Sequence, residues 1–342
     1  MVSVSAASRP PTPSAWLATI AAARAWLFLV VLLTGFELWS ETSFGASFVF
    51  NIYNVRSIAI FATAPLLLAI GQTFVIISGG IDLSVGFTMG FAAVVAANAV
   101  NIATPAIGTL PGLAVAIVVA IGASAIPGLV NGLLIARLRV PPFIGTLGMY
   151  GVARGVAYLL AGGTTVPINN DALNYMGNGT LFAVPMVVVL TALALLGLHY
   201  ILSQSRFGQY TYAIGGSRVA AVRSGINVGS VTVRLYILSA VCAGIGGILY
   251  TGRFSAGAAQ AGEPLLLDSI AAVVIGGASL FGGSGTVIGT LIGALIVAVI
   301  QYGLVFINVE PFWQFVAVGV VIIISVLVDQ SQRRIGGGRV DE

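Results

Sequence analysis

Long apolar runs with almost no charge in them constrain this chain more than any other feature of its sequence. Hydrophobic residues make up 58% of its 342 residues, charged residues make up 7%, and the mean hydropathy is +1.07. A water-soluble surface normally carries about a quarter of charged side chains. The chain therefore cannot cover itself with such a surface, and its sequence predicts an all-α membrane protein.

The apolar runs have the length of membrane-spanning helices. A bilayer core of about 30 Å requires about 20 apolar residues per helix, so we predict a polytopic bundle of about ten transmembrane helices. Glycines interrupt the third and the eighth run. The predicted spans are 21–39, 57–78, 83–100, 113–138, 143–161, 182–203, 235–252, 265–281, 287–307 and 312–328.

The arginines indicate which side of the membrane each loop faces. Ten spans put both termini on one side, and cytoplasmic loops usually carry the excess of positive charge. With a cytoplasmic N-terminus, eleven of the 14 arginines fall on the inner side. We therefore expect both termini in the cytoplasm, a disordered N-terminal segment over residues 1–20, a membrane domain over 21–328 and a cytoplasmic tail over 329–342.

Residue types that are rare or missing exclude several kinds of chemistry. All 14 basic residues are arginine, so the sequence cannot form a GxxxxGK[ST] phosphate loop or a Schiff base, both of which need lysine. The single Cys242 and the single His199 leave no cysteine cluster and no histidine zinc site. No stripe of basic and aromatic residues indicates nucleic-acid binding. We therefore expect no enzyme and no metal site, and any ATP hydrolysis must belong to a partner.

The longest inner loop, residues 204–234, is the only polar stretch large enough to dock a cytoplasmic protein. Ser217 suits an N-cap, residues 218–224 can form two helical turns, and Gly225 suits a stop. This short helix, presenting two alanines between arginines, could sit in a groove of another protein or lie on anionic lipid headgroups. The residues that would form or contact it are Ser217, Arg218, Ala220, Ala221, Arg223 and Gly225.

The stretch from Gly71 to Gly90, GQTFVIISGGIDLSVGFTMG, combines adjacent glycines with a carboxylate inside the predicted membrane domain. This pattern is typical of a broken or re-entrant helix, which is tolerated at membrane depth only where it is buried or lines a watery cavity. A carboxylate is costly in lipid, so Asp82 is a candidate functional residue. It could also act as the N-cap of a helix that starts at Leu83, and the two roles are compatible.

Other polar residues also lie within the predicted spans. Thr146, Tyr150 and Arg154 recur at four-residue intervals and share one helical face. Thr146 and Tyr150 could contact a hydroxylated solute, whereas for Arg154 we favour a structural role. Gln72 and Asn131 suit hydrogen bonds between helices more than contacts to a ligand.

Three motifs together resemble the permease subunits of bacterial ABC importers for monosaccharides, the ribose, xylose, arabinose and galactose group. They are GQTFVIISGGIDLSVG at 71–86, TLGMYGVARG at 146–155 and AIGGSRVAAVRSGI at 213–226. The resemblance extends from about residue 54 to residue 328. The third motif is similar to the coupling segment that fits the ATPase in that family, although Ser217 stands where the family usually has Asn.

The resemblance implies a permease that moves a monosaccharide or related polyol across the bacterial inner membrane by alternating access. The implied partners are a second permease subunit, identical or different, a cytoplasmic ABC ATPase, a periplasmic or lipid-anchored solute-binding protein, and membrane lipid. ATP and Mg would bind the ATPase, and no cofactor is expected on this chain. Residues 204–234 would be the coupling loop of the permease domain. Candidate residues of the translocation pathway are Gln72, Asp82, Ser84, Asn131, Thr146 and Tyr150.

Two other functions remain open from the sequence. The first is an ABC permease for another small solute, a branched-chain amino acid or a nucleoside. The second is a proton-coupled secondary transporter with Asp82 and Asp268 as proton carriers, in which the docking loop would lack a purpose. Asp268 lies one turn after Pro264, where a carboxylate suits the start of a helix, so we expect an architectural role for it.

Overall fold

The computed structural model describes residues 15–310 and 312–335, and most of these residues are helical. The shorter helices are α6 (Asp171–Asn178), α8 (Arg206–Gly216), α9 (Arg218–Arg223) and α11 (Leu265–Ile275). Strands β1 (Val166–Pro167) and β4 (Ala256–Gly257) pair antiparallel, as do β2 (Thr180–Leu181) and β3 (Val184–Pro185). The long helices are α1 (Ala15–Phe44), α2 (Ile52–Ile77), α3 (Val85–Ile107), α4 (Thr109–Ala136), α5 (Pro142–Leu160), α7 (Met186–Gln204), α10 (Val228–Phe254), α12 (Val287–Phe306) and α13 (Phe312–Ile335).

The predicted all-α polytopic fold is confirmed, with a correction to two of the spans. Each of the ten predicted runs coincides with a helix, and eight helices in the described part of the chain are long and apolar enough to cross a membrane. The apolar stretch of α13, Phe312–Leu327, is shorter. Helix α11 has 11 residues, about 16 Å at about 1.5 Å per residue. It ends early because the chain turns at Gly277, whose φ is 90°, so the run 265–281 is not one helix.

The N-terminal boundary also differs from the prediction. Helix α1 begins at Ala15, so residues 15–20, which we predicted to be disordered, are helical. The reason is local, because residues 15–25 are rich in alanine, the strongest helix former. Residues 1–14 and 336–342 lie outside the described residues, and the predictions for them stay predictions.

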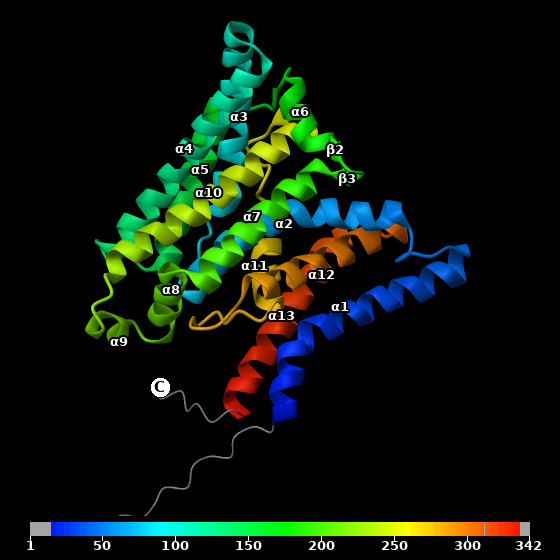
Figure 1. The fold of residues 1–342 in the computed structure, drawn as a ribbon, viewed down its shortest axis with the longest axis vertical. Coiled ribbons are helices and arrows are strands. Elements are labelled where there is room, and N and C mark those ends of the chain that lie inside the picture. Colours follow the sequence, from blue (N-terminus) through cyan, green and yellow to red (C-terminus); the bar gives the residue numbers. More distant parts are fainter. Residues whose placement is uncertain (1–14, 311, 336–342) are drawn as a thin grey trace, which may run out of the picture.

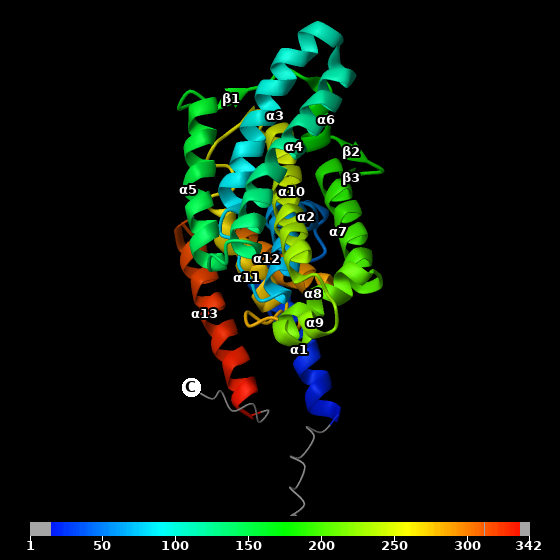
Figure 2. The same cartoon turned by 90° about the vertical axis from the view of Figure 1, so that its left-hand side faces the viewer.

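The chain passes back and forth between two ends of the molecule. The beginning of α1, the end of α13 and the helices α8 and α9 lie at the lower end in both ribbon views (Figures 1 and 2). The turn from α3 to α4, helix α6 and the short strands lie toward the opposite end. Both described termini therefore lie at the same end as the segment that we predict to be the coupling loop.

Two groups of helices form the interior. In the first group, α10 packs against α3 and α4, and both of these helices also contact α5. In the second group, α2 packs against α11 and α12. Contact between α10 and α2 joins the two groups. Backbones approach closely between α4 and α10. A Cβ at Gly128 would lie 2.5 Å from the carbonyl oxygen of Tyr236, and one at Gly132 would lie 2.6 Å from Cα of Val233. Small residues permit such contact between membrane helices.

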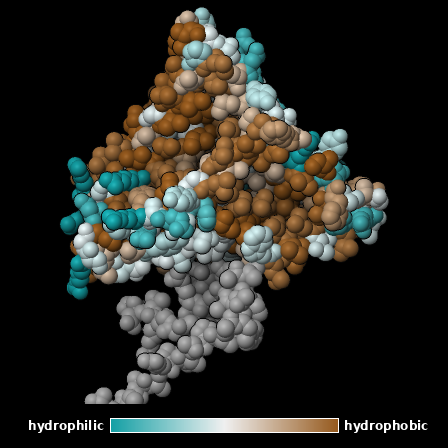
Figure 3. Space-filling model, in the orientation of Figure 1, coloured by the Kyte–Doolittle hydropathy of each residue, from teal (hydrophilic) through white to brown (hydrophobic). Residues whose placement is uncertain are grey.

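The surface separates an apolar area from a charged end. Figure 3 shows a large hydrophobic area on one face of the molecule. Exposed apolar side chains include Val118 and Ile126 of α4 and Leu193 and Leu196 of α7. Hydrophilic residues gather at the end that holds α8 and α9. The positive-inside rule therefore favours a cytoplasmic position for this end. Its exposed arginines are Arg137, Arg139, Arg206, Arg218, Arg223 and Arg234.

Candidate coupling surface and translocation site

The short helix predicted in the polar loop is present as α9. The hydroxyl of Ser217 accepts a hydrogen bond from the amide of Ala220 at 3.3 Å, which is the predicted N-cap. The helix ends at Arg223, and Gly225 follows with a φ of 80°, a conformation that glycine adopts without strain. The predicted start and stop signals are therefore confirmed.

The side chains that α9 presents differ from the predicted set. Ala221 is buried and belongs to the same apolar cluster as Ile214 and Val228. It lies on the face of α9 that packs against the rest of the chain, so it cannot contact a partner. Ala220 is exposed, as are both arginines of the helix. Val219 and Val222 are 63% and 58% exposed, and they are the apolar side chains that a partner would meet.

The loop that we predict to dock the ATPase is shorter than residues 204–234, because α10 begins at Val228 rather than at residue 235. Asn227 caps α10 by accepting a hydrogen bond from the amide of Ser230 at 3.0 Å. Arg234 therefore lies on α10. Residues 205–227 connect α7 to α10, and they contain α8 as well as α9.

Helix α8 contacts both places where the membrane helices are interrupted. A Cβ at Gly215 would collide with the carbonyl oxygen of Ile77, the last residue of α2. The same carbonyl accepts a hydrogen bond at 2.8 Å from the amide of Gly283, in the loop after α11. The hydroxyl of Tyr212 on α8 donates to the carbonyl of Gly285 at 2.7 Å. The end of α2, the loop after α11 and α8 are therefore in direct contact with one another.

Asp82, in the break between α2 and α3, lies at the centre of a buried hydrogen-bond network. Its carboxylate accepts hydrogen bonds from the amide and hydroxyl of Ser84, at 3.0 and 2.6 Å, and from the hydroxyl of Ser239 on α10 at 3.0 Å. The side-chain amide of Gln72 bonds to both backbone polar groups of Asp82. Asn131 of α4 donates to the hydroxyl of Ser84 at 2.9 Å. The network thus joins four helices.

The predicted N-cap role of Asp82 is wrong in its detail. Helix α3 begins at Val85, and Ser84 rather than Asp82 occupies the capping position. The Asp82 side chain bonds to the residue two positions later, which closes a turn ahead of the helix. Sequence reasoning missed Ser239, because nothing in the sequence links it to a residue 157 positions earlier. A pathway role for these residues stays a prediction, since all five side chains are at most 1% exposed in this conformation.

The polar face predicted on α5 is present, but its three members have different surroundings. Thr146 is buried, and its hydroxyl donates at 2.8 Å to a carbonyl of its own helix. The hydroxyl of the half-buried Tyr150 donates to the carboxylate of Glu263 at 3.4 Å. Arg154 is exposed, and its guanidinium lies 5.3 Å from the ring centroid of Phe87. Tyr150, Arg154 and Glu263 therefore form a polar group that reaches the surface.

Glycines form an open stripe along α5. Gly148, Gly151 and Gly155 are exposed, and a Cβ on any of them would have no atom within 4 Å. Their spacing puts them on one helical face, and small residues four positions apart permit close packing of two membrane helices. No other described helix covers this stripe.

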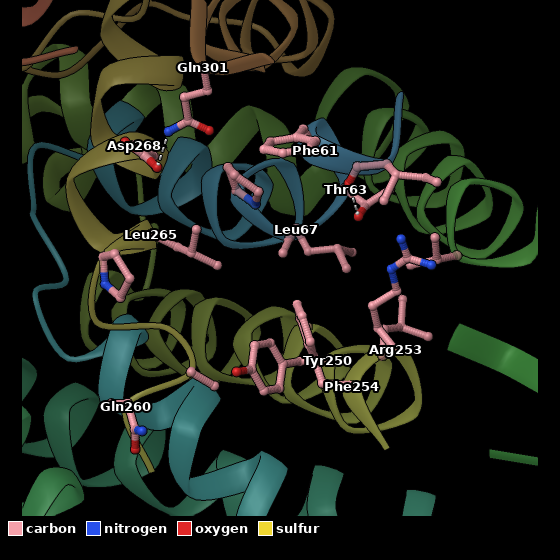
Figure 4. Close-up of a pocket in the computed structure, with 18 of the residues that line it drawn as sticks. Phe61, Thr63, Leu67, Tyr250, Arg253, Phe254, Gln260, Leu265, Asp268 and Gln301 are labelled. Carbon is pink, nitrogen blue, oxygen red and sulfur yellow. Dashed lines mark hydrogen bonds between the residues drawn. The ribbon is translucent and has the colours of Figure 1, made fainter. Parts of the chain in front are cut away.

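A cavity of about 620 Å³ opens between α2, α10 and α11 (Figure 4). Asp268 lies in the first turn of α11, as predicted, and its carboxylate accepts a hydrogen bond at 2.8 Å from the side-chain amide of Gln301 on α12. Both side chains line the cavity. Sequence reasoning missed this site because its walls come from distant parts of the chain.

Comparisons with known proteins identify similar chains. Residues 54–326 match the protein family described as branched-chain amino acid transport system, permease component. The ribose import permease protein of Escherichia coli strain K12 is 36% identical over 91% of this chain and 96% of the relative. The galactose/methyl galactoside import permease protein of the same strain is 36% identical over 82% and 87%. The fructose import permease protein of Rhizobium meliloti is 36% identical over 77% and 74%.

Proposed function

This chain belongs to the matched family of permease components, and on that basis we propose that it imports a monosaccharide or related polyol as the membrane subunit of an ABC importer. The observation that carries the proposal is the similarity over most of the chain to relatives named for the import of ribose, galactose and fructose. The chain is a multi-pass protein of the inner membrane. Its exposed apolar surface suits contact with lipid.

The energy for import would come from a cytoplasmic ABC ATPase that holds ATP and Mg. Helix α9 supports this proposal because Val219 and Val222 are exposed beside Arg218 and Arg223, a combination that suits a groove on a protein. Movement of α9 and α8 would reach both interrupted membrane segments directly, since α8 bonds to the loop after α11 and packs on the end of α2. The alternative for α9, a position on lipid headgroups, would leave this connection without a use.

A second permease subunit would pack against α5. The open stripe of Gly148, Gly151 and Gly155 supports close approach of a second helix. Tyr150, Arg154 and Glu263 lie on the same side of α3 and α5, and they would border a pathway shared by the two subunits. A periplasmic or lipid-anchored binding protein would deliver the solute to the opposite end from α9.

Branched-chain amino acids are the alternative substrate, because the family description names their transport. The relatives reported above are all named for sugars, which favours a sugar. A proton-coupled mechanism has less support. Three protein donors already hold the carboxylate of Asp82 in a closed network.

Reconstitution tests the proposal. The chain, placed in liposomes with its ABC ATPase and solute-binding protein, should accumulate ribose, galactose or fructose only when ATP is supplied on the ATPase side. The control is the chain alone under a proton gradient, which should accumulate none of these sugars. Uphill uptake by the chain alone would contradict the proposal, and ATP-driven uptake of leucine without any sugar would reassign the substrate.

A further inference from the structure

The cavity between α2, α10 and α11 has the properties of a small-molecule site rather than of a packing defect (Figure 4). Its volume of about 620 Å³ lies within the range of about 300–1,000 Å³ typical of ligand pockets. Its wall includes small residues, Ala64 of α2 and Gly246 of α10. Pro65, on the same wall, cannot donate the backbone hydrogen bond that would continue α2 regularly.

One end of the cavity holds a carboxylate with unused hydrogen-bonding capacity. Asp268 is 4% exposed, and within the described residues its only hydrogen bond comes from Gln301 to Oδ2. No described arginine forms an ion pair with it. A buried carboxylate is unfavourable unless donors surround it, so the free oxygen calls for donors from a bound molecule. The amide of Gln301 holds the carboxylate in place and has its own oxygen available.

The remaining walls suit a molecule with hydroxyl groups on its rim and C–H groups on its faces. Tyr250 and Phe254 of α10 present aromatic rings to the cavity, and Leu67 and Leu265 lie across from them (Figure 4). Ligand sites combine such apolar walls with a few placed polar groups. Gln260, in the loop between α10 and α11, also lines the cavity.

We propose that each subunit binds one monosaccharide-sized polyol in this cavity, with neighbouring hydroxyls donating to Asp268 and a ring face against Tyr250. The inference rests on the proposed import of a sugar. It places a solute-binding site within one subunit, away from Asp82 and from the exposed face of α5.

An amino acid fits the cavity less well than a polyol. The ammonium and carboxylate groups of a free amino acid are bonded to the same carbon atom. A site for it therefore needs an anionic and a cationic side chain close together. Figure 4 places Asp268 and the cationic Arg253 at opposite sides of the cavity. The guanidinium of Arg253 already donates to Asn178 at 2.8 Å.

Protection of an introduced thiol tests the site without the ATPase. Ala64→Cys places a thiol on the cavity wall, and Ala136→Cys is its matched control, because Ala136 is equally half-buried and lines a separate groove near α9. Both are made in a Cys242→Ala background, and the full chain in nanodiscs is alkylated with N-ethylmaleimide. At least one of ribose, galactose and fructose should slow the alkylation of Ala64→Cys severalfold. The same sugar should leave the alkylation rate of Ala136→Cys unchanged.

A second pair of variants tests the role of the carboxylate. Asp268→Asn should raise the sugar concentration for half-protection by about tenfold or more, because it removes charge-assisted hydrogen bonds. Asp171→Asn changes an exposed carboxylate on α6 and should leave that concentration unchanged. Gln301→Asn, which withdraws the supporting amide, should weaken protection as well and gives an independent measurement if the first variant does not fold.

The outcomes separate this inference from the proposed function. Equal protection at both thiols, or protection that Asp268→Asn and Gln301→Asn leave unchanged, would overturn the site. Protection by L-leucine and by no sugar would overturn the polyol assignment. ATP-driven uptake of a sugar that never protects the thiol would also overturn the inference and leave the importer standing. Sugar protection in a complex that transports none of the sugars would support the site and contradict the importer.

Discussion

At the scale of single residues, the chain places its polar groups where other polar groups meet them. Asp82 accepts three hydrogen bonds from two serines, and it thereby ties the break before α3 to α10. A carboxylate at membrane depth is tolerable only with such partners. The residue therefore acts as a clamp between elements in this conformation, whatever further role it has in transport.

Removing that acceptor should destabilise the protein. Asp82→Ala leaves the hydroxyls of Ser84 and Ser239 buried without their acceptor, and each such group costs about 1–3 kcal/mol. We expect a clearly lower midpoint of thermal unfolding for the purified chain, whereas Asp171→Ala, at an exposed position, should leave the midpoint nearly unchanged. An unchanged midpoint for Asp82→Ala would show that the network contributes little to stability.

At the scale of elements, contact between backbones holds α4 and α10 together. Gly132 lies against Val233, where a side chain would displace one helix. Gly132→Leu should therefore lower the yield of folded protein and its unfolding temperature, because overpacking of this kind costs about 1–3 kcal/mol or more. Gly122→Leu is a control on the same helix, since a Cβ there meets no atom within 4 Å. Equal effects of both substitutions would contradict the packing argument.

The exposed valines of α9 allow a test of docking that leaves the fold intact. Val219→Glu combined with Val222→Glu should abolish co-purification of the ATPase with the chain and leave membrane insertion unchanged. Val184→Glu, at an exposed valine of β3, is the control and should keep the ATPase bound. Ala221→Glu would not serve this purpose, because Ala221 is buried and its replacement would damage the fold. Normal co-purification of the double variant would exclude docking through α9.

Local signals predicted the elements well, and relations between distant residues escaped prediction. Hydropathy located all ten runs, and Ser217 with Gly225 located α9, because each signal lies within a few residues. The burial of Ala221 depends on residues of other elements, which a helical pattern of six residues cannot reveal. The cavity depends on Asp268 meeting Gln301 across 33 positions. The sequence indicated a helix-start role for Asp268 and nothing that links it to Gln301.

At the scale of the whole molecule, α5 is one of several helices of which the described residues of the subunit cover only a small part. Only four of the 19 residues of α5 are buried, and its glycine stripe is open. If a second copy covers this face, Gly151→Leu with Gly155→Leu should convert dimers into monomers in native mass spectrometry. Gly197→Leu on the open side of α7 should leave dimers intact. Dimers that survive the double substitution would place the subunit contact elsewhere.

Helix α8 contacts both the end of α2 and the loop after α11. This double contact bears on what a mutation there would do to transport. Because the carbonyl of Ile77 accepts a hydrogen bond from the amide of Gly283 beside Gly215, the end of α2, the loop after α11 and α8 meet at one point. If α8 transmits the movement of an ATPase, as proposed, a bulky substitution at Gly215 should leave ATP hydrolysis running while it stops solute uptake.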